Sequence, residues 1–253
     1  MRLEVLLSTM NLNKKDLNKM NITSKCTVIN QTNKEGYTKY KNFDIYSYNE
    51  KGLSRSRNRG LEKVTGDIII LCDDDVVYNK DYEKNIINEF MNNPKADVIF
   101  FNIDNPFRMK KINKKNKRLH FYNSLKYGSV NIAFKRKCIK NIRFNELFGA
   151  GSKYSNGEDS LFIKDLIKNK YKLYSSNKYI AKISDSNSTW FNGFDEKYFF
   201  DKGALFTALN YRFRKLLMLQ YLLRHKYVLT DYKINDAYKI MKKGSIDYIY
   251  EKD

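Results

Sequence analysis

Short apolar runs recur along the first half of the chain and are separated by polar, turn-rich segments. Runs of this length that are rich in Val, Ile, Tyr and Phe are typical of buried β-strands. The predicted strands are "LEVLLST" (3–9), "CTVIN" (26–30), "DIYSY" (44–48), "DIIILC" (67–72), "DVIFFNI" (97–103) and "SVNIAF" (129–134).

Helical patterns lie between several of these strands. One covers 54–65, with Ser54 as the expected N-cap and a stop at Gly66. Another covers 80–93, before Pro94, and its apolar residues fall on one face: Tyr82, Ile86, Ile87 and Phe90. Strands that alternate with helices predict an α/β fold with a mostly parallel central sheet flanked by helices on both faces.

Polar clusters directly follow three of the predicted strands. They are "STMN" after the first strand, "NQT" after the second, and Asp73, Asp74 and Asp75 after "DIIIL". In open sheets of this kind, ligands bind beyond the carboxyl ends of the strands. We therefore expect a ligand site at that edge of the sheet.

The character of the sequence changes near Tyr198. Leucines recur from there at roughly helical spacing among Arg and Lys residues: Leu205, Leu209, Leu216, Leu219 and Leu223. This pattern predicts a C-terminal helical extension. Residues 228–253 carry little further signal beyond one short helix.

Composition indicates a folded globular protein. The 253 residues include only 2 Pro and 11 Gly, and 15% are aromatic, which argues against disorder and long linkers. The N-terminus lacks the pattern of a signal peptide, and the longest later apolar stretch, 216–223, is too short to span a bilayer. We expect a protein that is soluble or bound to a membrane surface.

The cysteines and histidines restrict the chemistry. Cys26, Cys72 and Cys138 are widely spaced and show no C-x-x-C pairing, which fits a reducing compartment and therefore the cytosol. With only His120 and His225, far apart in sequence, neither a zinc site nor a Ser-His-Asp triad is expected. Catalysis would have to rely on carboxylates, amides and a hard cation.

Three acidic residues follow the fourth strand directly. If the segment stays extended, Asp73 and Asp75 point to the same side and Asp74 points elsewhere. Mg²⁺ and Mn²⁺ bind one or two such carboxylates together with the phosphate oxygens of a substrate. A solvated acidic turn is the alternative, because Asp is common in turns.

Two further motifs surround predicted helix starts. "KGLSRSRNRG" combines Gly52 with Arg55, Arg57 and Arg59, and it suits either a phosphate site or an amphipathic helix with a solvated arginine face. "FGAGSKYSNGEDSLF" places "ED", residues 158 and 159, at the start of a helix after three glycines. These acids suit catalysis, but carboxylates in a first turn also stabilise a helix without it.

The order of these motifs over residues 1–195 resembles family 2 glycosyltransferases of the GT-A fold. The resemblance implies a donor-binding half over 1–104 and an acceptor-binding half over 105–195, followed by the helical extension over 196–253. It implies a metal-dependent, inverting transferase of the hexosyltransferase type. The implied cofactor is Mn²⁺ or Mg²⁺, and a UDP-sugar is the expected donor.

The resemblance also implies roles for single residues. Asp75 would bind the metal with Asp73, which also faces the ribose or donor sugar, and Asp159 would be the general base with Glu158 beside it. The nucleotide-sugar pocket would comprise Thr9, Asn11, Asn30, Gln31, Gly52, Ser54, Arg57, Asn58, Asp73 and Asp74. On the acceptor side, Gly151 would line the site, and Trp190 would stack on a sugar ring unless it is a core residue.

Two positions depart from the family pattern. Asn30 and Gln31 stand where many members have an acidic residue that contacts the base, although amides can also pair with a uracil edge. Ser184 and Asp185 stand where many members have a histidine near the metal. The base and the third metal ligand therefore stay open.

Positive charge is concentrated in one segment. The net charge is +20, and residues 105–145 contain 13 Lys and Arg with no Asp or Glu. Such a segment attracts an anionic acceptor, such as a lipid-linked glycan or a charged polysaccharide, or the inner face of the cytoplasmic membrane. The expected role is synthesis of a bacterial surface polysaccharide. The alternative is a non-catalytic nucleic-acid-binding protein, which would have no need for the three acids or the "GED" helix.

Overall fold

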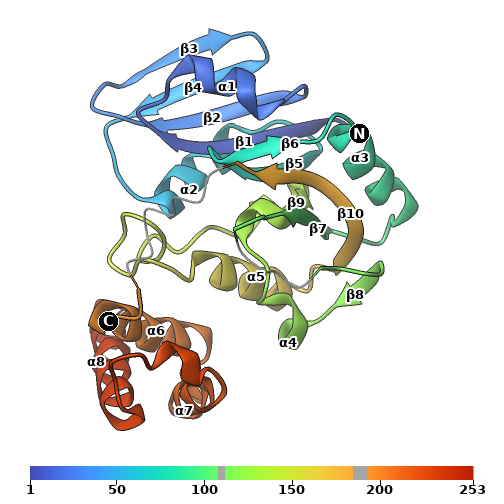
Figure 1. Cartoon of the computed structure of the whole chain (residues 1–253). Coiled ribbons are helices and arrows are strands. Elements are labelled where there is room, and N and C mark those ends of the chain that lie inside the picture. The colour runs from blue at the N-terminus through green and yellow to red at the C-terminus, as the bar shows by residue number, and fades with distance from the viewer. Residues whose placement is uncertain (108–111, 185–192, 253) are drawn as a thin grey trace.

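A central sheet organises the computed structural model, which describes residues 1–107, 112–184 and 193–252 (Figure 1). Within these residues, ten strands form the sheet in the order β3-β4-β2-β1-β5-β9-β7-β10-β6, and β8 pairs with β10. The strands are β1 (Leu3–Met10), β2 (Lys25–Gln31), β3 (Gly36–Tyr40), β4 (Phe43–Tyr48), β5 (Ile68–Asp73), β6 (Val76–Tyr78), β7 (Val98–Asp104), β8 (Lys117–Leu119), β9 (Ile132–Lys135) and β10 (Leu173–Ile183).

The sheet has a parallel half and a mixed half. Strands β4, β2, β1 and β5 run parallel, whereas β9 lies antiparallel between β5 and β7. All six strands expected from apolar runs are present, although residues 129–131 form a 3₁₀ turn before β9. Four strands were not predicted because their residues are few or largely polar, as in "GYTKY" of β3 and "LYSSNKYIAKI" of β10.

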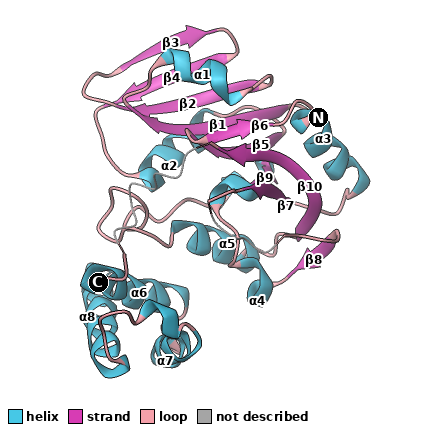
Figure 2. Ribbon diagram, viewed as in Figure 1, coloured by secondary structure: helices cyan, strands magenta, loops and turns pink. Residues whose placement is uncertain are grey.

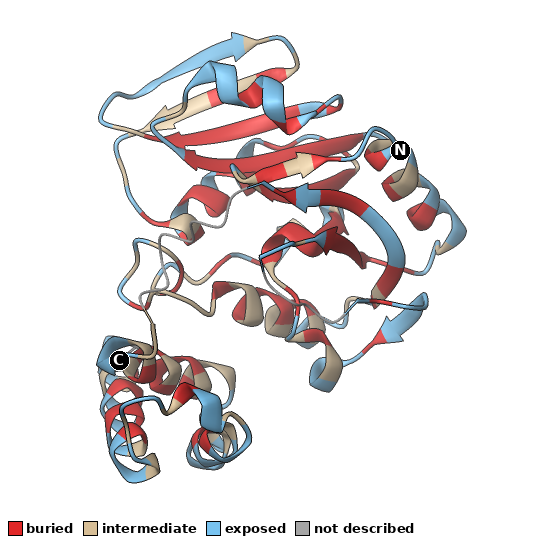
Figure 3. Cartoon of the chain, in the orientation of Figure 1, coloured by how far each residue is buried: buried red, intermediate tan, exposed pale blue. Residues whose placement is uncertain are grey.

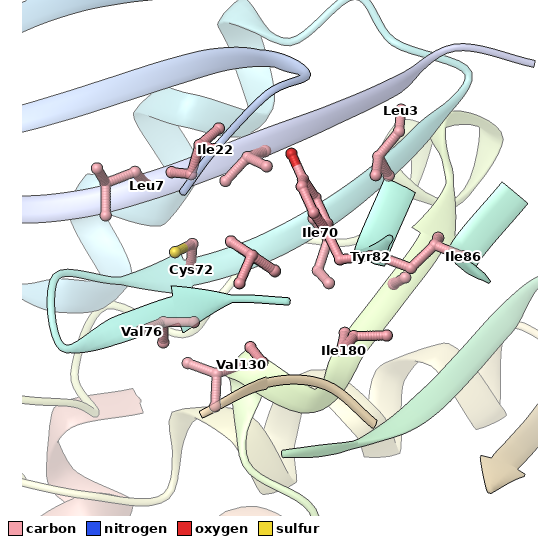
Figure 4. Close-up of a cluster of buried hydrophobic side chains, with 14 of the residues drawn as sticks. Leu3, Leu7, Ile22, Ile70, Cys72, Val76, Tyr82, Ile86, Val130 and Ile180 are labelled. Carbon is pink, nitrogen blue, oxygen red and sulfur yellow. The ribbon is translucent and has the colours of Figure 1, made fainter. Parts of the chain in front are cut away.

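Helices cover both faces of the sheet (Figure 2). The helices over residues 1–184 are α1 (Lys14–Leu17), α2 (Leu53–Lys63), α3 (Tyr82–Asn92), α4 (Phe121–Ser124) and α5 (Glu158–Lys168), and the 3₁₀ turns are η1 (Asn18–Met20), η2 (Ser129–Asn131) and η3 (Arg136–Lys140). On one face, Tyr82 and Ile86 of α3 pack with Leu3 and Ile70 of the sheet (Figure 4). On the other face, α2 and α5 share a core with β5 and β9. Because α2 and α5 lie on the same face, their first turns can meet.

The C-terminal segment is helical. It contains α6 (Glu196–Leu209), α7 (Arg214–Arg224), the 3₁₀ turn η4 (Lys226–Val228) and α8 (Ile234–Lys252). The expectation of only a short helix after 228 was wrong, since α8 is 19 residues long. Its Gly244 permits close contact, because a Cβ there would lie 1.9 Å from the carbonyl oxygen of Phe200 in α6.

The helical segment packs directly on the rest of the chain. Phe148, Tyr154 and Leu161 form one buried cluster with Leu205 of α6 and Tyr248 of α8. Buried residues therefore continue from the sheet into the helices (Figure 3). The division of the chain into a catalytic domain over 1–195 and a helical extension over 196–253 stays a prediction. None of the helices in the described part of the chain has the length and apolar character needed to cross a membrane.

Candidate active site

Hydrogen bonds connect the first turn of α2 to the segment that precedes α5. Leu53 N donates to Ala150 O at 2.9 Å, and Ser54 Oγ donates to Phe148 O at 2.5 Å. The expected N-cap role of Ser54 was wrong, because the cap position is Gly52 and Ser54 lies inside the helix, fully buried. Ser54 is therefore buried against the segment before α5 and positions that segment.

Asn58, one turn later in α2, makes further hydrogen bonds to the chain before α5. Its Nδ2 donates to Phe144 O at 3.0 Å, and its Oδ1 accepts from Phe144 N at 2.8 Å. A second acceptor for Nδ2 is Glu146 Oε1 at 3.0 Å. The side chain of Asn58 is thus bonded within the protein.

Glycines shape the turn that leads into α5. Gly149 has φ +111°, and a Cβ there would lie 3.2 Å from Ser54 Oγ. Gly157 is the N-cap of α5 with φ +115°, and a Cβ there would lie 2.7 Å from Leu205 Cδ1. Both positions combine a backbone conformation that favours glycine with close neighbours. Gly151, also at positive φ, lies against Gly52 in the same turn.

Residues of α6 and α8 form hydrogen bonds with the segment that leads into α5. Tyr154 Oη donates to Asp247 Oδ2 at 2.7 Å, and Ser155 N donates to the buried Asp201 Oδ2 at 2.9 Å. Lys202 Nζ donates to Asn156 Oδ1 at 3.2 Å, and burial lowers the pKa of Lys202 to about 8. The helical segment therefore fixes the approach to α5.

Arg57 joins three carboxylates at the centre of the site. Its side chain is 1% exposed, and its guanidinium lies 3.0 Å from Asp73 Oδ1, 3.3 Å from Glu158 Oε1 and 3.2 Å from Asp159 Oδ1. It also donates to Ser129 Oγ at 2.6 Å and lies over the Phe144 ring. Residues of α2, β5 and α5 that are distant in sequence thus converge on one buried cation.

The three carboxylates differ in exposure. Glu158 is 11% exposed at its side chain, whereas Asp159 and Asp73 are 26% and 32% exposed. Asp159 and Asp73 therefore face the solvent side of the cluster, and Glu158 lies deeper. One guanidinium offsets a single negative charge, so the cluster retains an excess of negative charge whenever two of its three carboxyls are ionised.

Burial and charge set the protonation of the pair on α5. Burial, with the nearby Asp159 charge, raises the pKa of Glu158 to about 7, although Arg57 opposes the shift. Burial also raises the pKa of Asp159 above its usual value, and there the main opposing influence is Arg57. The charges of Asp73, Asp159 and Glu158 raise the pKa of Arg57, so this side chain remains cationic. The cluster therefore contains a permanent cation beside two carboxyls with elevated pKa.

The acidic turn after β5 differs from its expected geometry. Asp73 ends β5, and Asp74 and Asp75 form the turn before β6. The alternation expected for an extended segment therefore does not apply. Thr9 Oγ1 donates to Asp74 Oδ2 at 2.8 Å, and burial raises the pKa of Asp74. Asp75 O accepts from Ser184 N and Oγ, which ties the turn to the end of β10.

The carboxyl ends of β1 and β2 meet this turn. Thr9 pairs in register with Asn30, and Ser8 pairs with Asp73. Asn30 Oδ1 accepts from Leu12 N at 2.9 Å, and Gln31 Nε2 donates to Gly52 O at 3.0 Å. The sheet thus gathers the predicted polar clusters at one edge, but both amides hold neighbouring loops.

The remaining predicted residues have different positions. Asn11 is exposed at the end of β1, with φ +49°, and its N donates to Gln31 O. Trp190, Phe191 and Asp185 lie outside the described residues, as do Arg108, Lys110 and Lys111 of the basic segment. Sequence reasoning missed Ser129, because an apolar run predicted a strand there and nothing marked its hydroxyl as a partner for Arg57.

The carboxylates provide a donor set suited to a hard cation. Among residues 1–107, 112–184 and 193–252, no three His, Cys, Asp or Glu side chains are arranged around one point as metal ligands. Mg²⁺ and Mn²⁺ need no such cage, since one or two carboxylates and substrate phosphates suffice. Asp73 is a partly exposed member of the acidic cluster, and Asp75 lies two residues later in the turn before β6, so the carboxylates present fit such an ion.

Residues 27–152, about half of the chain, match the model of the family described as Glycosyl transferase family 2. The chain belongs to glycosyltransferase family 2. It is 26% identical over 219 residues to the minor teichoic acid biosynthesis protein GgaB of Bacillus subtilis (strain 168), an alignment that covers 76% of this chain. The chain spans only 23% of the length of that relative.

Solved structures support the fold assignment. S. aureus TarS 1–349, also solved in complex with UDP and with UDP-GlcNAc, matches with a TM-score of 0.59 over 90% of this chain and 72% of that chain, at 16% identity. The mannosyltransferase PcManGT from Pyrobaculum calidifontis, in complex with GDP-Man and Mn²⁺, matches with a TM-score of 0.56 over 100% of this chain and 88% of that chain, at 12% identity. The expected GT-A type fold is confirmed.

Proposed function

We propose that this family 2 chain is an inverting glycosyltransferase that moves a sugar from a nucleotide-diphosphate sugar to a glycan or lipid-linked glycan in bacterial surface polysaccharide synthesis. The observation that carries this proposal is the cluster in which Arg57 joins Asp73 to Glu158 and Asp159. This cluster brings Asp73, which we assign to the donor site, beside Glu158 and Asp159, which we assign to the acceptor site. The similarity to a teichoic acid biosynthesis protein supports the assignment to surface polysaccharide.

The donor would bind at the carboxyl ends of β1, β2 and β5. Thr9, Asn11, Asn30, Gln31, Gly52 and Asp74 surround that edge, and we propose a UDP-sugar because TarS has been solved with UDP and with UDP-GlcNAc. Asp75 and Asp73 would hold Mn²⁺ or Mg²⁺. Such an ion, when bound, offsets the charge of the diphosphate leaving group.

Asp159 would act as the general base. The acceptor hydroxyl oxygen forms a bond to the anomeric carbon as the bond from that carbon to the diphosphate breaks, and the hydroxyl proton passes to Asp159. Attack opposite the leaving group inverts the configuration. A base must be ionised to accept this proton, and Arg57 favours the ionised form of Asp159 against its burial.

Glu158 would serve a different role from its neighbour. Its carboxyl is more buried, and its raised pKa of about 7 favours a protonated carboxyl near neutral pH. A neutral Glu158 beside Asp159 limits repulsion within the pair, and we propose that it orients Asp159. The two acids would thus divide the tasks because their environments differ.

The acceptor would be drawn in by the basic segment over 105–145, and Gly151 and Trp190, which follow that segment in sequence, are proposed acceptor contacts. Positive charge over 105–145 would attract an anionic acceptor or an anionic bilayer. We propose that the chain works at the cytoplasmic face of a membrane that carries a lipid-linked acceptor.

A binding and turnover assay tests the proposed function. Thermal shifts with UDP-GlcNAc, GDP-mannose and other nucleotide sugars, each with and without Mn²⁺, should show stabilisation by one donor that is lost with EDTA. Mass spectrometry of a teichoic-acid-type acceptor should then show addition of one sugar. Stabilisation by nucleic acid and by no nucleotide sugar would favour the nucleic-acid-binding alternative instead.

A further inference from the structure

Helix α7 has apolar side chains both on its buried face and on its exposed face. Met218 and Leu222 are fully buried in a core shared with α6 and α8. Leu216, Leu219 and Leu223 are instead 62%, 43% and 51% exposed. Their spacing of three and four residues places them on one face of the helix. We call these three residues the leucine stripe.

Basic and aromatic residues flank the leucine stripe. Phe213 precedes the helix and Tyr227 follows it, and both are largely exposed. Residues 210–230 contain five basic residues and no Asp or Glu, and these are Arg212, Arg214, Lys215, Arg224 and Lys226. The segment therefore offers an apolar surface between two cationic ends. In the view of Figure 1, α7 lies at the lower end of the molecule, away from the sheet.

We propose that α7 docks the protein on an anionic lipid bilayer. The leucine stripe would enter the boundary between headgroups and acyl chains, and the flanking Arg and Lys residues would bind lipid phosphates. This inference rests on the proposed function only for the location of the acceptor at a membrane. It assigns the docking surface to a helix outside the active site.

Charge favours a bilayer over a second copy of the chain. Two copies that met through the leucine stripe would bring the basic ends of α7 close to those of its partner, which is unfavourable. An anionic leaflet instead attracts each basic residue, by about fivefold in binding per residue near the surface. The basic residues around the leucine stripe therefore favour binding to an anionic bilayer and disfavour pairing with a second copy of the chain.

Vesicle flotation tests the proposal with the full chain. We expect binding to vesicles of phosphatidylcholine with about one-third phosphatidylglycerol, and much weaker binding to phosphatidylcholine alone, as for other basic interfacial helices. Replacing Leu216, Leu219 and Leu223 by Ser should lower the partition coefficient about tenfold or more, because three apolar side chains no longer leave water. Met91→Ser, which alters an exposed apolar residue of α3, is the matched control and should change little.

A fluorescent label gives a second measurement that does not depend on the triple variant folding. Cys26, Cys72 and Cys138 are buried, so Leu219→Cys provides an accessible thiol for a polarity-sensitive dye. Anionic vesicles should shift its emission to shorter wavelength, whereas the same dye at Met91→Cys should not respond. Equal flotation of the parent and the leucine variant, or no shift at position 219, would overturn the proposal. A leucine variant that converts a dimer to a monomer without a change in vesicle binding would also overturn it.

Nucleotide binding separates this inference from the proposed function. The leucine variant should keep the thermal shift of the parent chain with its nucleotide sugar, because α7 is not part of the donor site. Vesicle binding without any nucleotide-sugar binding would leave the docking surface intact and reject the proposed function.

Discussion

Arg57 Nη1 lies 3.2 Å from Asp159 Oδ1, so a residue in α2 holds the first turn of α5 across 102 positions of sequence. The same guanidinium binds Asp73 at the end of β5. One buried cation therefore sets the distance between the donor-side acid and the proposed general base. Stability and activity should both depend on it.

Replacing Arg57 by Ala should destabilise the fold strongly. The change leaves Glu158, Asp159 and Asp73 without their shared cation, and the loss of one partner from a buried ion pair costs about 3–5 kcal/mol. Arg55→Ala is the matched control, because Arg55 pairs with Glu146 on the surface, at 47% and 45% exposure, where pairs contribute about 1 kcal/mol or less. Urea unfolding measures both, and equal losses would show that Arg57 does not anchor the site.

The pKa of Glu158 predicts a dependence of stability on pH. A folded-state pKa raised from 4.5 to about 7 means that folding takes up a proton between these values. The stabilising contribution is fully present below the unfolded pKa and is lost as pH rises through about 7. The free energy of unfolding should therefore fall more between pH 5 and pH 8 in the parent than in Glu158→Gln, which cannot ionise. Parallel curves for the two proteins would refute the assigned shift.

Gly157→Ala should distort the start of α5. Position 157 has φ +115°, and the new Cβ would meet Leu205 of α6 at 2.7 Å. We expect a loss of roughly 1–3 kcal/mol from backbone strain and the steric clash. Gly36→Ala in β3 is the control, because nothing lies within 4 Å of a Cβ there. Thermal unfolding compares the two, and a neutral Gly157→Ala would mean that the turn is not constrained as described.

Removal of the divalent cation should abolish tight donor binding. Calorimetry should detect the nucleotide sugar with Mn²⁺ but not with EDTA, and Asp75→Asn should weaken binding about tenfold or more because a charged ligand is lost. Asp81→Asn, at an exposed position just before α3, provides the control. Equal affinity in Mn²⁺ and EDTA would contradict the assigned role of Asp75.

The sequence predicted the elements better than the contacts between them. Alternating apolar runs and helical patterns identified β1, β2, β4, β5 and β7, because buried strands need continuous apolar residues. The polar β10 gave no such signal, since its place in the sheet depends on pairing with β7. Likewise α8 was underestimated, because its stability comes from close packing on α6 and not from a strong sequence pattern.

For the candidate active site, too, the sequence predicted the positions of elements better than the contacts between side chains. Topology alone gathers the ends of β1, β2 and β5, so the sequence could place Thr9, Asn30 and Asp73 together. The partners of Arg57 could not be predicted, because a motif rich in arginine suits a phosphate as well as a protein carboxylate. Only the packing of α2 beside both α5 and the end of β5 brings three acids to that side chain and leaves Ser54 buried.

The most direct test of the account is transfer by Asp159→Asn. The change keeps the shape of the side chain and removes its basicity, so donor binding by calorimetry should stay at the parent value while the transfer rate falls roughly 10²-fold or more. Asp165→Asn, six residues later on α5, is the control and should transfer at close to the parent rate. Transfer by Asp159→Asn at near the parent rate would contradict the account, because Asp159 would then be only an acid that stabilises the start of a helix.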